Sequence, residues 1–148
     1  PMLRLMAIIP PRTEIVEAIS KRLKLSGDET TRLKNWANTA KIDQDTKPAA
    51  FEKILYQNDL QAVKDVIALD IILYDSKAPD ASKALKNQIG FLKDAKKYER
   101  PIFPVKGEDL LKKGIEAGPA LGERLLKLED LWIDSGFKLS KVALLKLL

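Results

Sequence analysis

Apolar residues recur along most of the chain at helical spacing, in segments that short polar or proline-containing breaks separate. Pro10 and Pro11 end the first segment and start the second. Residues 60–74 are apolar nearly all round, which is typical of the central helix of a bundle. The strict alternation that marks strands is missing from the sequence. The pattern therefore predicts an all-α fold, an irregular bundle of about seven to nine helices.

Local signals predict where several of these helices begin and which faces they bury. Ser26 and Glu29 have the spacing of a capping box, and Pro79-Asp80 is expected to begin another helix. The two prolines of residues 100–104 predict an extended segment. The residues expected to face inward are Ile15, Val16, Ile19 and Leu23; Leu33, Trp36, Ala37 and Ala40; Leu85, Ile89 and Leu92; and Leu121, Leu125, Leu128 and Trp132.

Composition narrows the function classes. The chain has 148 residues, of which 45% are hydrophobic and 32% charged, as expected of a globular domain. It has no apolar run near the ~20 residues of a membrane span, and no signal peptide is visible, so a cytoplasmic protein without a membrane partner is expected. Histidine and cysteine are both missing. A self-contained hydrolase or zinc enzyme is therefore disfavoured.

Charge is segregated along the chain. Residues 1–42 carry a net charge of +4, residues 43–75 carry −4, and residues 83–127 carry +5. Such segregation fits a basic face that binds a polyanion. Lysine-rich helix faces are also common simply because they are solvated, so charge alone leaves both interpretations open.

Two groups of carboxylates are candidates for chemistry. Asp43 and Asp45 have the spacing of a magnesium pair, but no rigid strand or glycine-rich turn accompanies them, and a solvated loop is the better interpretation. Asp70 shares a helical face with Val63, Ile67 and Tyr74 and should need a partner. It could act as an acid with a raised pKa, but a structural ion pair or cap is favoured.

The glycine-rich segment 107–122 predicts a helical hairpin. Gly107 is the expected N-cap of a short helix, and Gly114 the expected left-handed residue after it, with Ile115 folding back onto the helix. Gly118-Pro119 should start the next helix, and Gly122 should let another backbone approach. Gly136 and Ser140 are expected to end that helix and to cap a last one.

The exposed amides at the start of the second helix could hold a phosphate, with nearby lysines supplying charge. The alternative is a tight helical hairpin whose glycines serve packing only. The residue pattern does not separate these two interpretations.

The string Gly-x-Asp-Leu-x-x-x-Gly-Ile-x-x-Gly-Pro-x-x-Gly-x-x-Leu at 107–125, followed by Leu-Glu-Asp-Leu-Trp-Ile-Asp-Ser-Gly-Phe at 128–137, resembles the C-terminal region of bacterial CCA-adding tRNA nucleotidyltransferases. These belong to the class II nucleotidyltransferase and poly(A) polymerase family, and the alphaproteobacterial branch is the most similar. Residues 3–40 resemble the body of the same proteins. The family's catalytic head, with a Gly-Ser turn and an Asp-x-Asp metal pair, lies N-terminal to this region. Glu129-Asp130 lacks the arginine of the family's nucleotide-selecting motif.

The resemblance implies an RNA-binding body at 1–100 and a tail at 101–148 that carries the glycine hairpin and packs on the body. The chain would bind tRNA or another structured RNA, while its own N-terminal catalytic head uses magnesium and CTP or ATP. By itself the chain should hold no cofactor or metal and be inactive. The alternative function is a helical protein–protein interaction or dimerisation module, which would use the apolar last helix. The expected RNA-binding residues are Lys106, Lys112, Lys113, Gly118, Gly122, Arg124 and Lys127, with Lys93, Lys96, Lys97 and Arg100 as a second group.

Overall fold

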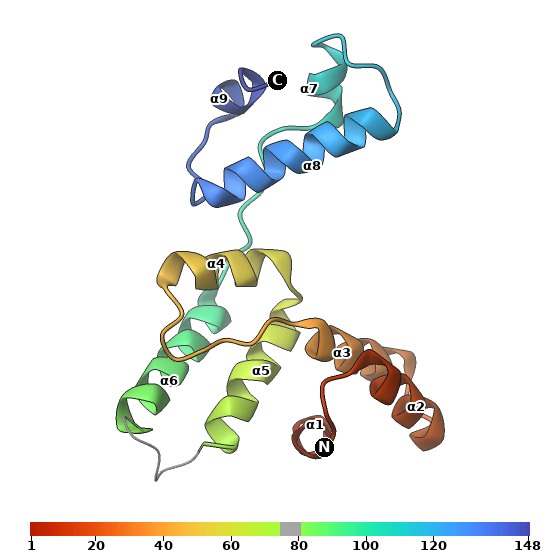
Figure 1. Cartoon of the computed structure of the whole chain (residues 1–148), viewed down its shortest axis with the longest axis vertical. Helices are drawn as coiled ribbons and strands as arrows, with labels where there is room; N and C mark the ends of the chain where they lie inside the picture. The colour runs from red at the N-terminus through yellow and green to blue at the C-terminus, as the bar shows by residue number, and fades with distance from the viewer. Residues whose placement is uncertain (75–80) are drawn as a thin grey trace. The chain divides into compact units, whose positions relative to one another are not determined.

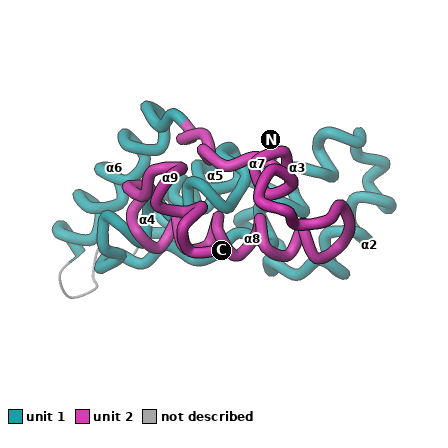
Figure 2. The backbone as a smooth tube through the Cα atoms, turned by 90° about the horizontal axis from the view of Figure 1, so that it is seen from above, with its two compact units in different colours: residues 1–99 teal, residues 100–148 magenta. Residues whose placement is uncertain are grey.

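The computed structural model describes residues 1–74 and 81–148, and this part of the chain contains nine helices and no strand (Figure 1). The all-α prediction is confirmed. The expected helix start at Pro79-Asp80 lies outside the described residues. Contacts divide the chain into two compact units, Pro1–Glu99 and Arg100–Leu148, which Figure 2 colours separately. The helices are α1 (Met2–Ile8), α2 (Thr13–Leu23), α3 (Gly27–Asn38), α4 (Pro48–Gln57), α5 (Leu60–Ile72), α6 (Ala81–Lys97), α7 (Gly107–Leu111), α8 (Pro119–Asp134) and α9 (Lys141–Leu145).

Helix α5 is the centre of the first unit, as its apolar sequence predicts. It packs against α1, α3, α4 and α6 (Figure 1). One hydrophobic cluster gathers Met6, Leu33 and Trp36 beside it, and a second gathers residues of α4, α5 and α6. Because it has neighbours on several sides, α5 can be apolar around most of its circumference without exposing a large apolar surface.

Capping fixes the ends of several helices in this unit. The Ser26 hydroxyl accepts from the Glu29 amide at 3.2 Å, and the Glu29 carboxylate accepts from the Ser26 amide at 2.9 Å, so the predicted capping box is confirmed. Asp59 caps α5 by accepting from the Ala62 amide at 2.9 Å. Helix α2 ends with Lys24 in the left-handed conformation, at a φ of 53°.

Three inward-facing predictions in the first unit are wrong. Leu23 is 54% exposed because it is the last residue of α2, and Ala40 is exposed because α3 ends at Asn38. Ile89 is 40% exposed because the neighbouring Gln88 takes the inward position on α6. Gln88 donates from Nε2 to the carbonyl of Ile42 at 2.8 Å, which satisfies a loop carbonyl that an apolar side chain would leave unpaired.

In the second unit, α7, α8 and α9 enclose a core of apolar side chains. Phe103 and Phe137 lie against the Trp132 ring, with ring centroids 5.4 and 5.0 Å away. Of the predicted stripe of α8, Leu128 and Trp132 are buried, while Leu121 and Leu125 are partly exposed. The buried residues of this unit are Val105, Leu110, Leu128, Trp132, Ile133 and Leu144.

The predicted helical hairpin is present, with two corrections. Gly114 is left-handed at a φ of 85°, and the Ile115 amide folds back to the Leu110 carbonyl at 3.2 Å, as expected. Pro119 is the first residue of α8 and Gly118 its N-cap, which confirms the predicted start. Gly107, however, is the first residue of α7 rather than its N-cap, which is Lys106. A Cβ on Gly122 would meet nothing within 4 Å, so the expected close backbone approach is wrong.

Candidate RNA-binding surface

All eleven residues expected to bind RNA are exposed. The first unit carries three of them and the second unit eight. Within the described residues, none of the lysines among them makes an ion pair, and neither does Arg124. Their charge is therefore available to an external anion. The eleven are Lys93, Lys96 and Lys97 in the first unit, and Arg100, Lys106, Lys112, Lys113, Gly118, Gly122, Arg124 and Lys127 in the second.

Three lysines flank α7, and of the two acidic residues of this helix, Glu108 is exposed and Asp109 is already engaged. Asp109 accepts from the Lys106 amide at 2.8 Å and from the Lys141 ammonium at 2.7 Å. These contacts, with that of Lys141 the larger, lower the pKa of Asp109. Because Lys141 and not a neighbour in sequence pairs with Asp109, the side chains of Lys106, Lys112 and Lys113 remain unpaired within the described residues.

On α8 the glycines and the cations occupy different faces. At 100° per residue, Arg124 lies about 200° from Gly122, and Lys127 about 140° from it. The Gly122 amide donates to the Gly118 carbonyl at 3.4 Å, and the Leu121 amide to the same oxygen at 3.1 Å. Since proline has no N–H, Ala120 has the first free amide in this helix. The expected phosphate cradle combined the Gly122 amide with the side chains of Arg124 and Lys127. The helix places these on different faces, so an anion bound by Arg124 and Lys127 would not contact the Gly122 amide.

Lys93, Lys96 and Lys97 belong to the last two turns of α6, where Lys96 and Lys97 also face the negative end of the helix dipole. That favourable placement explains these lysines without any ligand. Lys112 and Lys113 lie in the same way at the C-terminus of the short helix α7, whereas Lys106, Arg124 and Lys127 have no such placement.

The paired carboxylates at 43 and 45 lie in an exposed loop. Both side chains are exposed, and Asp43 lies 3.5 Å from the Lys41 ammonium. The Thr46 amide donates to the Asp43 carbonyl at 3.0 Å, which closes a turn. This confirms the interpretation as a solvated loop. Across residues 1–74 and 81–148, no group of three acidic, histidine or cysteine side chains could hold a metal ion.

Among the described residues, the most deeply buried carboxylate is one that sequence reasoning missed. Asp65 on α5 is 2% exposed and accepts two hydrogen bonds from the Arg32 guanidinium, each at 2.7 Å. Gln61 adds a third at 3.0 Å. The hydrogen bonding between Arg32 and Asp65 is the main cause that raises the pKa of Arg32. Arg32 and Asp65 are 33 positions apart, so helical spacing gives no signal of the pair.

Asp70, for which a partner was expected, makes no hydrogen bond or ion pair with any residue of the described chain. Burial is the main cause that raises its pKa; Asp43 adds to the shift and Lys41 opposes it. The ion pair or cap expected for Asp70 is not found among the described residues, whereas Asp65 on the same helix forms an ion pair with Arg32.

No family model matches the chain, but three curated proteins are similar to part of it. All three are called CCA tRNA nucleotidyltransferase 1, mitochondrial. The mouse protein is 35% identical over 77 residues and the human protein 33% over 79, covering 48% and 49% of this chain. The zebrafish protein is 29% identical over 126 residues, or 78% of this chain. The chain spans only 18% to 29% of the length of these relatives.

The structure also bears on membranes. In the parts of the chain that it describes, no helix is both long and apolar enough to cross a bilayer.

Proposed function

We propose that this chain is the helical tRNA-binding region of a CCA-adding tRNA nucleotidyltransferase. The observation that carries the proposal is the similarity to three CCA tRNA nucleotidyltransferases, which reaches 78% of the chain in the zebrafish protein. The exposed, unpaired lysines of the second unit give the proposal a physical basis. We further propose that the region is C-terminal in its parent and that the parent is of the bacterial, alphaproteobacterial-like type.

In this proposal the chain binds the tRNA and does not catalyse nucleotide transfer. Lysines and arginines would neutralise phosphates of the tRNA elbow and acceptor stem, and they would read the shape of A-form RNA more than its bases. The catalytic head would lie in another part of the parent protein, and magnesium with CTP or ATP would be bound there. The chain itself is therefore expected to transfer no nucleotide to tRNA, with or without magnesium.

A salt titration of tRNA binding tests the proposal. If phosphate contacts dominate, the logarithm of the binding constant should fall linearly with the logarithm of the salt concentration. The slope should indicate several contacts, because each contributes about 0.7 to 0.9. Binding that barely responds to salt, or no binding of tRNA at low salt, would contradict the proposal.

A second function, docking to a protein or to a second copy of the chain, is favoured by one observation. Val142 in α9 and Leu147 just after it are 65% and 58% exposed, although Leu144 between them is fully buried. An apolar interface of that kind should strengthen or stay constant in salt. Sedimentation of the chain at low and high salt tests docking to a second copy, since RNA binding through phosphates predicts no self-association at high salt.

A further inference from the structure

A cleft of about 340 Å³ lies between α2 and α3, which pack against each other in the first unit (Figure 1). Lys21 and Lys24, near the end of α2, and Lys34 on α3 line it. Among the described residues of the lining, Glu17 is the one carboxylate, so positive charge is in excess there. None of the eleven expected RNA-binding residues lines this cleft.

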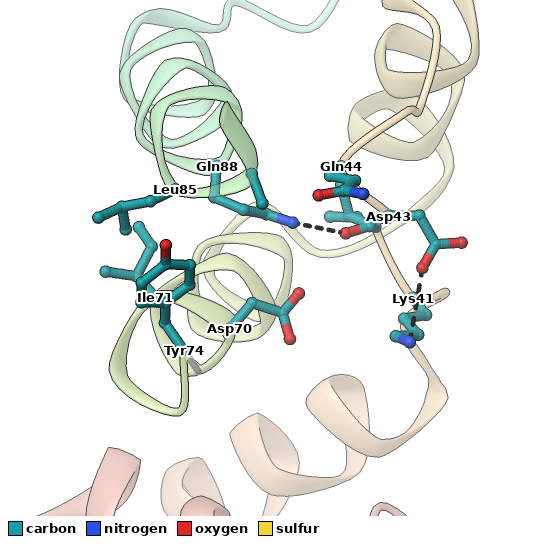
Figure 3. A pocket seen from close by; sticks show the side chains of 10 residues that line it. Lys41, Asp43, Gln44, Asp70, Ile71, Tyr74, Leu85 and Gln88 are labelled. Atoms are coloured by element: carbon teal, nitrogen blue, oxygen red, sulfur yellow. Dashed lines mark hydrogen bonds and ion pairs between the residues drawn. The ribbon is translucent and has the colours of Figure 1, made fainter. Parts of the chain in front are cut away.

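A second pocket of the same unit has the opposite balance of charge. It lies between the loop at 41–44, the end of α5 and the start of α6 (Figure 3). The charged residues of its described lining are Lys41, Asp43 and Asp70, so it would repel an anion. The positive charge of the cleft between α2 and α3 is therefore a local property and does not simply follow from the net charge of the chain.

Hydrogen-bond donors outnumber free acceptors in the cleft. The Lys34 ammonium lies 2.7 Å from the Glu17 carboxylate, so this acceptor is already engaged. Lys21 and Lys24 make no ion pair within the described residues. The hydroxyl of Thr30, a half-buried residue of the lining, makes no hydrogen bond to them either. A group that is rich in acceptors and negatively charged, such as a phosphate, would complement these donors.

The end of α2 accounts for part of this arrangement, because cations are favoured where the last carbonyls of a helix are unpaired. Two of these carbonyls are already satisfied here. The Lys24 amide donates to the Lys21 carbonyl at 3.3 Å. The Leu25 amide donates to the Ser20 carbonyl at 3.0 Å. Lys34 belongs to α3, outside the last turn of that helix, so neither helix end explains its place in the cleft.

We infer that this cleft binds a phosphate group of the RNA backbone through Lys21, Lys24 and the Thr30 hydroxyl. Contacts of this kind position RNA without reading its bases. Small-molecule sites bury about 70–90% of their ligand, whereas both lysines here are exposed, so the open cleft suits one phosphate of a polymer better than a free anion. It would also use the net charge of +4 in residues 1–42, where the expected RNA-binding surface has no residue. RNA as the source of the phosphate rests on the proposed function.

Acetylation of lysines, measured by mass spectrometry on the whole chain, locates the contact. With tRNA at about ten times its dissociation constant, acetylation of Lys21 and Lys24 should slow about tenfold, in proportion to the unbound chain. Lys47 is an exposed lysine of the same unit outside the cleft, and its rate should not change. Millimolar inorganic phosphate in place of tRNA should leave all these rates nearly unchanged.

The outcomes separate this inference from the proposed function. Protection of Lys112 and Lys113 without protection of Lys21 and Lys24 would overturn the inference and leave the proposed function standing. If tRNA protects no lysine, the proposed function fails, and RNA fails with it as the source of the phosphate. Inorganic phosphate that protects Lys21 and Lys24 as well as tRNA does would overturn RNA as the source and assign the cleft to a free anion.

Lys24→Gly removes one cation of the cleft with little risk to the fold, because Lys24 has a φ of 53°, in the left-handed region that favours glycine. The log–log slope of tRNA binding against salt should fall by about 0.7–0.9, the effect of one phosphate contact. Lys47→Gly is the matched control, since it replaces an exposed lysine at the N-cap of α4, where glycine is tolerated. Equal slopes for the two variants would contradict the inference.

Removing the carboxylate of the cleft should act in the opposite direction. Glu17→Gln releases the Lys34 ammonium and removes a charge that repels phosphate, so tRNA should bind about two- to fivefold more tightly. Glu14→Gln removes the same charge from the same helix outside the cleft and should tighten binding less. If Glu17→Gln binds tRNA no more tightly than Glu14→Gln, the cleft does not hold the phosphate.

Discussion

The two units bury different kinds of side chain. The first unit encloses polar groups among its apolar ones: Ser20, Asp65 and Gln88 are all less than a tenth exposed. The second unit, whose residues 100–148 are all described, buries apolar side chains alone. Its turns instead depend on positive φ angles at Gly114, Gly118 and Gly136. Specific polar chemistry is thus held inside the first unit, whereas in the second the candidate chemistry lies on the surface.

The largest expected effect comes from removing the tryptophan of each unit. Trp36 and Trp132 are 6% and 4% exposed, and Trp→Ala at such a site costs about 3–5 kcal/mol. If the units are separate in stability, Trp132→Ala should speed amide hydrogen exchange in residues 100–148 far more than in residues 1–99. Trp36→Ala is the matched variant and should do the reverse. Equal loss of protection throughout would show one cooperative unit.

The buried ion pair of the first unit gives the next effect. Asp65→Asn leaves the Arg32 charge without its partner, which should cost about 2–3 kcal/mol, below the 3–5 of a fully buried pair because the Arg32 side chain is 35% exposed. Asp43→Asn breaks an exposed pair and should cost under about 0.5 kcal/mol. Urea unfolding of both variants measures the difference, and two equal midpoints would contradict the structural role of Asp65.

Gly118, the N-cap of α8, and Gly122, inside that helix, distinguish backbone strain from helix propensity. Gly118 has a φ of 150°, a conformation that alanine adopts at a cost of about 1–3 kcal/mol. Gly122 lies inside the helix with open space around its missing Cβ, so Gly122→Ala should stabilise by about 0.5–1 kcal/mol. In thermal unfolding, Gly118→Ala should lower the melting temperature and Gly122→Ala should raise it. A loss of stability in Gly122→Ala would mean that something does pack against it.

The smallest effects are pH-dependent and opposite in sign. The raised pKa of Asp70 means that its ionised form disfavours folding, so stability should decrease as the pH rises through the window between its unfolded and folded pKa values. Asp70→Asn should remove that loss and gain under about 1 kcal/mol at neutral pH. The lowered pKa of Asp109 acts the other way: its contribution is present above the unfolded pKa and is lost as the pH falls through the folded one. Melting curves of Asp70→Asn and Asp109→Asn from pH 3 to 7 should therefore diverge from the unsubstituted chain in opposite directions, and parallel shifts would contradict both assignments.

The structural features that depend on the spacing of neighbouring residues were predicted correctly from the sequence. Helical periodicity, the capping box at Ser26 and the left-handed Gly114 are properties of neighbouring residues, and all three are confirmed. Contacts between distant residues were missed: nothing in the chain pattern pairs Arg32 with Asp65, or directs Gln88 toward the Ile42 carbonyl. The expected RNA-binding residues are exposed, but exposure is common for lysine and does not establish a ligand.

The positions of Gly122 and Arg124 on α8 also differ from what their closeness in the sequence suggests. Proximity in sequence suggested one phosphate cradle, but the helical turn sends the two positions to opposite faces of α8. The amide that Gly122 would have offered is bonded within the helix. Sequence distance was therefore a poor guide to which residues share a face of α8, whereas the helical angle, which follows from the sequence positions, separates them.

The most direct test of the central claim is the salt dependence of tRNA binding in a charge-reversed variant. Lys112→Glu/Lys113→Glu should weaken binding at low salt and reduce the log–log slope by roughly 1.4–1.8, which corresponds to two lost phosphate contacts. Lys138→Glu/Lys146→Glu changes the same charge at two exposed lysines of the same unit that lie outside the expected surface, and its slope should change by less than half as much. Equal slopes for the two variants would show that general charge, and not the surface beside α7, holds the RNA.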